Sequence, residues 1–258
     1  MAFSQWLAAT TVLTLAASPV PAQLTKEERV CQQAAAKQCP TFLGKKIKCL
    51  VGCDKQALKG KVPAADCLPP FGGKTLACVT TAATKALAGI AEKCADDCPE
   101  CYAGGDCSTH ASMLLAGIEA HVDLVAPLVG CDDAASPDGL TKNEAKVRQK
   151  VALVVGTFVA ATEKCLAKCR KAEGEGKVAP GSCDYGAETD TKTIECLIKA
   201  GNKALDVVED PELDAPECLA PELSFTLPIA AGLIEEFDPA IFCGSPSPAF
   251  VAQTPILR

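Results

Sequence analysis

A pattern of six cysteines that recurs along the chain is the feature that most constrains its fold. Residues 24–67 match residues 140–183 without a gap, with 17 identities in 44 aligned positions. The shared cysteines are Cys49, Cys53, Cys67, Cys78, Cys101 and Cys131 in the first copy and Cys165, Cys169, Cys183, Cys196, Cys218 and Cys243 in the second. Self-similarity over such a long period indicates a structural unit that occurs twice. We therefore predict two tandem units, residues 24–139 and 140–258, that arose by internal duplication and fold as separate helical bundles.

Each unit is predicted to contain about three helices, which makes the fold class all-α. A capping-box pattern opens the first helix of both units, in Thr25 with Glu28 and in Thr141 with Glu144. Pro40 removes a backbone donor within the first of these helices and is expected to kink or split it. The expected second helices cover residues 75–94 and 191–209, and the third helices cover residues 109–129 and 227–242.

The spacing of the shared cysteines favours three disulfides within each unit. In Cys49-x-x-x-Cys53 the two side chains project from the same helix face, so a neighbouring helix or loop can supply both partners. Spacing alone does not choose among the many pairings that six cysteines permit. The preferred pairs are Cys53 with Cys67, Cys49 with Cys78 and Cys101 with Cys131, and in the second unit Cys169 with Cys183, Cys165 with Cys196 and Cys218 with Cys243.

Five further cysteines lie only in the first unit and make the total odd. They are Cys31, Cys39, Cys94, Cys98 and Cys107. Two additional disulfides and one unpaired thiol would account for them, and the unpaired thiol could link two chains. The four cysteines at positions 94, 98, 101 and 107 lie within 14 residues, so a metal site or a redox pair is the alternative there. We expect disulfides, because Cys101 belongs to the shared pattern.

The N-terminal segment and the cysteine content point to the same compartment. The first 22 residues carry no charged side chain and end in the small-residue segment Val20-Pro21-Ala22. This pattern is typical of a secretory signal peptide, here residues 1–22. The rest of the chain keeps all 17 cysteines, which favours an oxidising environment. We expect a secreted or periplasmic protein without a membrane span, because the apolar run is too short to cross a bilayer.

Charge and the scarcity of catalytic residues argue against several classes of function. The formal net charge is −7 and the sequence shows no basic stripe, so we expect no nucleic-acid partner. His110 and His121 are eleven residues apart on one predicted helix, too far to share a metal ion, and are interpreted as surface residues. No nucleophile-elbow or phosphate-loop motif occurs, so we expect neither an enzymatic activity nor a cofactor.

Three short motifs recur in both units. They are a Lys-Cys-Leu-x-x-Cys helix, a Gly-Lys-Val-x-x-x-x-Cys loop and a Lys-Thr-x-x-Cys helix, which begin at Lys48, Gly60 and Lys74 in the first unit. Together they resemble uncharacterised cysteine-rich helical repeat proteins that are predicted to be secreted by environmental bacteria. The resemblance covers both units and implies no activity.

These observations favour an exported, disulfide-stabilised helical module that binds a ligand or has a structural role. The sequence names neither the ligand nor a partner. The alternative is a cysteine-based metal-binding protein or a thiol redox protein, since the cysteines of the first unit are close together along the chain.

Overall fold

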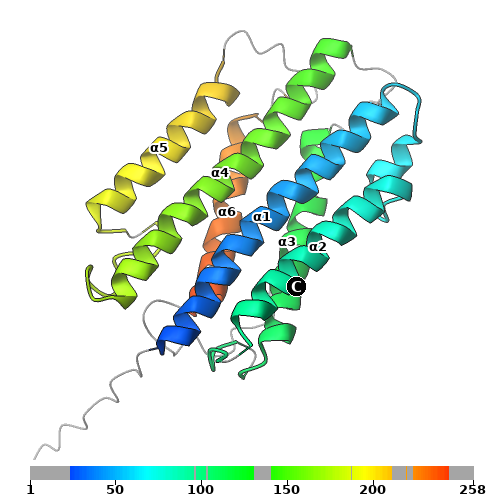
Figure 1. Ribbon diagram of the computed structural model, residues 1–258. Coiled ribbons are helices and arrows are strands. Elements are labelled where there is room, and N and C mark those ends of the chain that lie inside the picture. The colour runs from blue at the N-terminus through cyan, green and yellow to red at the C-terminus, as the bar shows by residue number, and fades with distance from the viewer. Residues whose placement is uncertain are drawn as a thin grey trace, which may run out of the picture.

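The computed structural model forms six α-helices and one short 3₁₀ helix within the residues that it describes (Figure 1). It describes residues 24–95, 97–102, 104–130, 141–186, 188–210, 219 and 223–243. The elements are α1 (Lys26–Ala57), η1 (Ala64–Cys67), α2 (Gly73–Lys93), α3 (Cys107–Gly130), α4 (Lys142–Gly174), α5 (Thr191–Val208) and α6 (Leu223–Phe242). These ranges contain no strand, which confirms the all-α class. The expected signal peptide lies outside the described residues.

The two long helices begin at the capping boxes that the sequence indicates. At α1, Thr25 Oγ1 accepts a hydrogen bond from the Glu28 amide at 3.0 Å, and the Glu28 carboxylate accepts one from the Thr25 amide at 2.6 Å. The same exchange at Thr141 and Glu144 has distances of 3.3 and 2.7 Å. Each box satisfies two amide groups that a helix start leaves without a backbone partner.

Of the two effects expected of Pro40, a kink or a split, the split does not occur in α1. The helix continues through it from residue 26 to residue 57, with Pro40 buried on the side that faces the core. A proline removes one backbone hydrogen bond, but the burial of many neighbouring side chains stabilises a helix of 32 residues.

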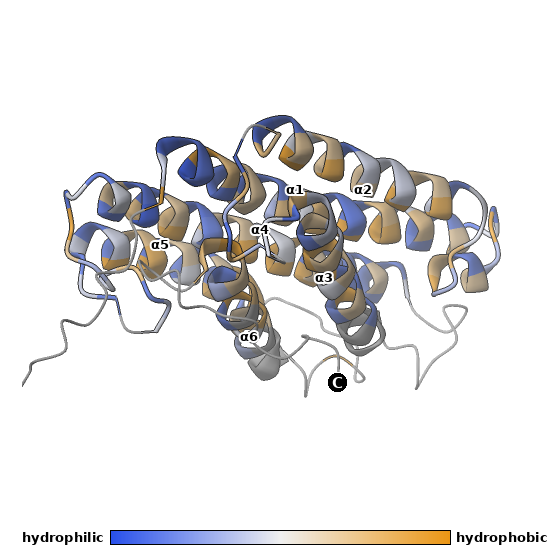
Figure 2. Ribbon diagram, turned by 90° about the horizontal axis from the view of Figure 1, so that it is seen from below, coloured by the Kyte–Doolittle hydropathy of each residue, from blue (hydrophilic) through white to orange (hydrophobic). Residues whose placement is uncertain are grey.

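The helices form two layers (Figures 1 and 2). Helices α5, α4, α1 and α2 lie side by side in this order, and α3 and α6 lie on one side of that layer. Lys46 of α1 ties α3 to the layer, because its fully buried ammonium group lies 2.6 Å from the Asp123 carboxylate and 3.2 Å from the Glu119 carboxylate. None of the described helices combines the length and the apolar character that crossing a membrane requires.

Helices α1 and α4 approach closely because small residues lie at their crossing. A Cβ atom at Gly156 would lie 2.9 Å from Ile47 Cδ1 and 3.7 Å from Gly44 Cα. The contact joins the two halves of the chain, and one apolar core then extends from Phe42 and Leu114 to Leu166 and Ile234. The expectation of two separate bundles is therefore wrong, because the halves share this core.

Candidate functional site

Disulfides connect the helices of each half in the same way. In the first half Cys49 bonds Cys78 and joins α1 to α2, while Cys53 bonds Cys67 of η1. In the second half Cys165 bonds Cys196 and joins α4 to α5, while Cys169 bonds Cys183 in the following loop. These are four of the six pairs expected from the spacing of the shared cysteines.

The expected pairs of Cys101 with Cys131 and of Cys218 with Cys243 are wrong. Cys101 bonds Cys243, at a sequence separation of 142 residues. Packing of the C-terminal end of α6 against the loop before α3 explains this pairing, since Tyr102 donates a hydrogen bond from its hydroxyl group to the Ile241 carbonyl. Cys131 and Cys218 lie outside the described residues.

Two further disulfides touch each other where α1 and α3 begin and α2 ends. Cys31 bonds Cys94, Cys98 bonds Cys107, and the sulfur atoms of Cys31 and Cys107 are 3.4 Å apart. The Cys31, Cys94 and Cys107 sulfurs all lie within 4.8 Å of one another. We call these four cysteines the sulfur cluster. The cluster contains Cys31 together with three of the four cysteines of the segment 94–107 that the sequence singles out. The fourth, Cys101, is not part of the cluster because it bonds Cys243.

The sulfur cluster can undergo thiol–disulfide exchange, or bind a soft metal ion after reduction. Exchange needs an attacking thiolate in line with a disulfide sulfur, and the 3.4 Å contact places Cys107 beside the Cys31–Cys94 bond. Cys31 and Cys94 are buried, whereas Cys98 and Cys107 are partly exposed, so an external thiol reaches the Cys98–Cys107 bond first. Three or four thiolates at this spacing are also a donor set that suits Zn²⁺.

Cys39 is the unpaired cysteine among the described residues. It lies in the middle of α1 and only 1% of its surface is exposed. Burial, and to a smaller extent the charge of Glu163, raises the pKa of the Cys39 thiol far above its ordinary value. A protonated thiol in this position is a poor nucleophile and is not accessible to a second chain. Self-association through Cys39, which an odd cysteine allows in principle, is therefore excluded in this fold.

A small cavity lies between Cys39 and Glu163 in the centre of the molecule. The volume that the centre of a water molecule can occupy in this cavity is about 20 Å³. Apolar side chains such as Leu233 and Phe237 form most of the cavity wall. That space is enough for one water molecule, which needs roughly 10–15 Å³. Glu163 Oε2 is buried without a hydrogen-bond partner. Burial, and then the nearby charge of Asp238, raises the pKa of Glu163 well above its ordinary value, so this carboxyl group holds its proton to a higher pH than an exposed glutamate does.

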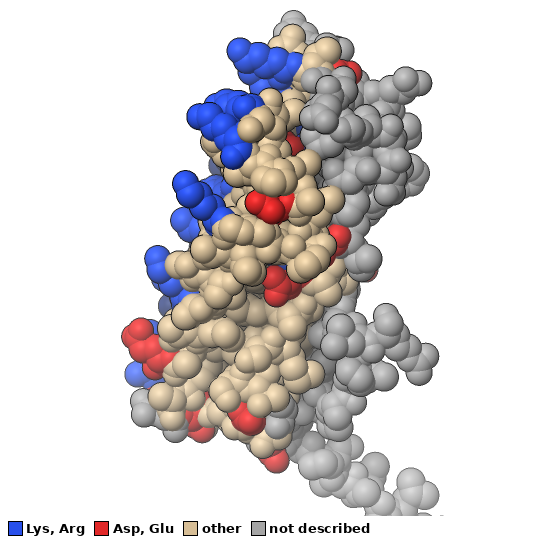
Figure 3. Space-filling view, turned by 90° about the vertical axis from the view of Figure 1, so that its right-hand side faces the viewer, with Lys and Arg blue, Asp and Glu red and all other residues tan. Residues whose placement is uncertain are grey.

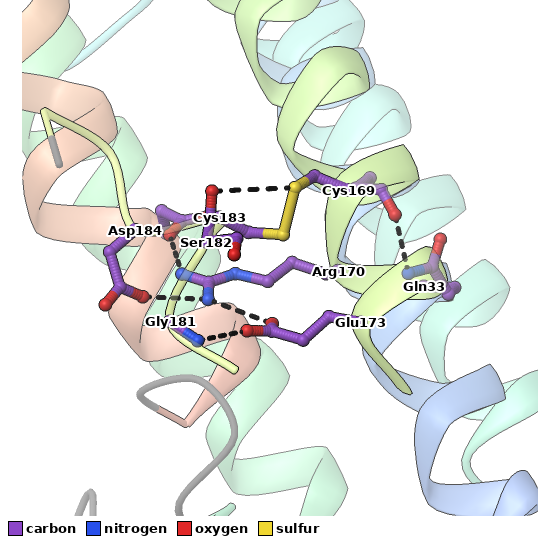
Figure 4. Close-up of polar contacts among 10 residues, drawn as sticks. Gln33, Cys169, Arg170, Glu173, Gly181, Ser182, Cys183 and Asp184 are labelled. Atoms are coloured by element: carbon purple, nitrogen blue, oxygen red, sulfur yellow. Dashed lines mark hydrogen bonds and ion pairs between the residues drawn. A yellow bond between two sulfur atoms is a disulfide. The ribbon is translucent and has the colours of Figure 1, made fainter. Parts of the chain in front are cut away.

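Arg170 of α4 is the centre of a buried ionic network (Figure 4). Its guanidinium group donates hydrogen bonds to Asp184 at 2.8 Å and to Asp238 of α6 at 2.7 Å, and it lies 3.4 Å from Glu173. Glu173 in turn accepts a hydrogen bond from the Gly181 amide at 2.5 Å. The network joins α4, α6 and the loop that carries Cys183. The sequence pattern does not indicate this network, because charged residues at helical positions are usually solvated.

The two histidines are partly buried on the face of α3 that meets α6. His110 stacks on Tyr102 at a centroid distance of 3.9 Å, and its Nε2 is 3.0 Å from the Ala240 carbonyl. His121 meets the Phe237 ring edge to face at 5.9 Å. Burial lowers the pKa of His110, so this ring is neutral at physiological pH. The interpretation of both as surface residues therefore holds only in part, because residues of α6 cover one side of each ring.

The sulfur cluster and the network of Arg170 are thus two concentrations of reactive or charged groups in the described interior, beside the ion pairs of Lys46 and of Arg148. Comparison of the chain with protein-family models, with curated proteins and with solved structures finds no match.

Proposed function

We propose that this protein is an exported helical module whose disulfides hold a rigid surface for binding or for a structural role. The observation that supports the proposal most is the distribution of the disulfides. Seven of them are present among the described residues, and they connect α1 to α2, α4 to α5, and the loop before α3 to the end of α6. Such links hold the helices in place even when no ligand is bound.

The proposal includes an origin by duplication of one unit, residues 24–139 and 140–258. The disulfides of the two halves support it, because α1 and α4 carry equivalent pairs. The helix-to-helix bonds have sequence separations of 29 and 31 residues, and both helix-to-loop bonds have a separation of 14.

Export also belongs to the proposal. It is supported by residues 1–22, which have the composition of a signal peptide, and by the number of disulfides, which form and persist in oxidising compartments. Expression of the full chain in a host with a secretion pathway tests export. We expect the product outside the cytoplasm to begin at Gln23, and a product that keeps Met1 would contradict the proposed signal peptide.

Mass spectrometry of the intact protein tests the cross-linked module. Each disulfide lowers the mass by about two units relative to the reduced chain. We expect alkylation without reduction to leave every cysteine of the seven bonds unmodified. Modification of these cysteines in the folded protein would overturn the proposal.

A second candidate, a thiol-exchange or metal-binding protein, is favoured by the sulfur cluster alone. Three sulfurs within 4.8 Å are close enough to ligate one ion once the disulfides are reduced. Reduction of the protein with a phosphine, followed by Cd²⁺, whose complexes with cysteine thiolates absorb in the ultraviolet, tests this candidate. A stoichiometric complex that is lost in Cys107→Ala and kept in Cys39→Ala would support it, and the absence of a complex would exclude it.

A further inference from the structure

Exposed lysines form two rows on the outer side of the four-helix layer. The row on α1 contains Lys37, Lys48 and Lys55, which recur at helical spacing on the side opposite the buried residues. The row on α4 contains Lys146, Lys164, Lys168 and Lys171, with the same relation to its buried face. The two helices lie side by side, so the rows run next to each other (Figure 1). We call these seven residues the lysine face.

The lysine face has no acidic side chain of its own helices to neutralise it. Asp54 of α1 pairs with Arg148. Glu163 and Glu173 of α4 are buried, and the other carboxylates of the two helices belong to their first turns. None of the seven lysines forms an ion pair with another described residue.

Charge is separated between the two layers, although the net charge of the chain is −7. Helices α1 and α4 contain 15 basic and six acidic residues. Helices α3 and α6 contain five acidic residues and no Lys or Arg. Figure 3 shows Lys and Arg along one edge of the molecule and most of the visible Asp and Glu away from it. The expectation that the chain has no basic stripe is therefore wrong, because net charge says nothing of how charge is distributed.

The shape of the lysine face favours a planar partner over a linear one. The face extends along most of α4, whose 33 residues span about 50 Å. Flanking helices continue it in the second dimension, with exposed Lys74 and Lys85 on α2 and exposed Lys199 and Lys203 on α5. No aromatic side chain is among the large exposed hydrophobic residues of the described chain, so the stacking that holds bases or sugar rings is missing. Lysine also acts as a point charge without the two-pronged geometry of arginine.

We propose that the lysine face adsorbs to the surface of an anionic lipid bilayer. The bilayer would be the partner in the binding function proposed above, and this inference rests on that function. A bilayer is planar, carries many phosphate groups and can contact both rows at once. Each lysine near such a surface contributes about 1 kcal/mol, and the attraction falls off within the Debye length, about 10 Å at 0.1 M salt. Binding is thus peripheral and reversible by salt.

Vesicle sedimentation with the oxidised chain of residues 23–258 tests the proposal. The probes are vesicles of phosphatidylcholine alone and of phosphatidylcholine with phosphatidylglycerol. We expect binding to the anionic vesicles only, and its loss at high salt. The triple variant Lys48→Gln, Lys164→Gln, Lys168→Gln should bind on the order of 100-fold more weakly, since three contributions of about 1 kcal/mol multiply in affinity.

A matched control removes the same charge elsewhere. The triple variant Lys59→Gln, Lys61→Gln, Lys177→Gln changes exposed residues in loops beyond the ends of α1 and α4 and should retain most of the binding. The corresponding Lys→Arg variant of the lysine face should bind like the wild type, and circular dichroism should show equal helix content in all variants. Equal losses in the two Gln variants, or no binding to anionic vesicles, would overturn the proposal.

A linear polyanion serves as the competing probe. Tight binding to single-stranded DNA or to an acidic polysaccharide, without binding to anionic vesicles, would assign the face to a linear polymer and overturn the bilayer proposal. Because disulfide content is measured separately by mass, failure of the vesicle experiment leaves the cross-linked module itself intact, and failure of the module would appear as free thiols.

Discussion

At the scale of single residues, the most costly groups are the ionisable ones in the interior. Glu163 lies beside the cavity with one carboxyl oxygen unpaired, and Arg170 lies among three carboxylates. Burial of a charge is unfavourable unless a partner offsets it, so a lone group such as Glu163 takes up a proton while Arg170 stays ionised. Both groups therefore influence stability more than surface charges do.

The pH dependence of stability should change in Glu163→Gln. The pKa of Glu163 is 4.5 in the absence of perturbation and is raised in the folded protein. As the pH rises above 4.5, the unfolded chain loses this proton and the folded chain keeps it, so the free energy of unfolding falls by about 1.4 kcal/mol per pH unit until the folded group ionises. Urea unfolding at several pH values measures the difference.

Glutamine does not titrate, so Glu163→Gln should not lose stability in this way. Its free energy of unfolding should therefore rise relative to that of the wild type as the pH rises to neutral. Glu195→Gln, at an exposed position of α5, is the control and should follow the wild-type curve. Parallel stability curves for Glu163→Gln and the wild type would show that Glu163 is ionised in the folded protein.

Arg170→Met should destabilise the protein by about 3–5 kcal/mol, because it removes the cation that pairs with the buried Asp238. Lys150→Met in the same helix breaks the exposed pair with Asp210, whose lysine side chain is 47% exposed, and should cost less than about 1 kcal/mol. Thermal and urea unfolding of both variants compare the two environments. A cost for Arg170→Met as small as that for Lys150→Met would indicate that water reaches the network.

At the scale of elements, the contact between α1 and α4 depends on the small residues at their crossing. Gly156 lies against Ile47 and Gly44, whereas Gly52 of α1 is exposed and has open space where a Cβ atom would lie. Both glycines carry the entropic cost of glycine in a helix, but only Gly156 has a packing role.

Substitutions at the two glycines should therefore have opposite effects. Gly52→Ala should stabilise the protein by about 0.8–1 kcal/mol through helix propensity. Gly156→Leu should destabilise it by roughly 1–3 kcal/mol or more, because the added atoms would collide with the packed α1. Differential scanning calorimetry gives both values. A stabilising Gly156→Leu would mean that α1 and α4 do not pack as described.

At the scale of the whole molecule, Cys101–Cys243 is the described disulfide that crosses from the first half to the second. In the chain-entropy model, stabilisation grows with the length of chain that a disulfide closes. The separation is 142 residues for Cys101–Cys243 and nine for Cys98–Cys107. Removal of the first bond should therefore release far more freedom in the unfolded chain.

The double variant Cys101→Ala, Cys243→Ala should lose up to about 5 kcal/mol, against less than about 3 kcal/mol for Cys98→Ala, Cys107→Ala. Denaturant unfolding measures both losses. Loss of the long-range bond should also lower cooperativity, because the described parts of the two halves would then be held together by noncovalent contacts such as the shared core and the Asp54–Arg148 pair. Equal losses in the two double variants would show that the length of the closed chain does not govern stability here.

The sequence by itself determined the local features of this protein. Capping boxes at Thr25 and Thr141 involve residues three positions apart, and the bonds of Cys49 and Cys53 close short stretches of chain. Helical periodicity expresses such features directly, so the helices and the four shared disulfides within the halves agree with the expectation from sequence, whereas the Cys31–Cys94 and Cys98–Cys107 bonds were not predicted.

Only the tertiary structure decided which helices meet across the halves. Cys101 pairs with Cys243 because α6 packs against α3. Glu163 of α4 is buried because α1 and α6 both pack against α4. The lysine face likewise depends on α1 and α4 turning their rows to the same side. These outcomes depend on contacts between residues far apart in the chain. Helix faces made of apolar and small residues resemble one another, so the spacing of residues does not specify which faces pack together.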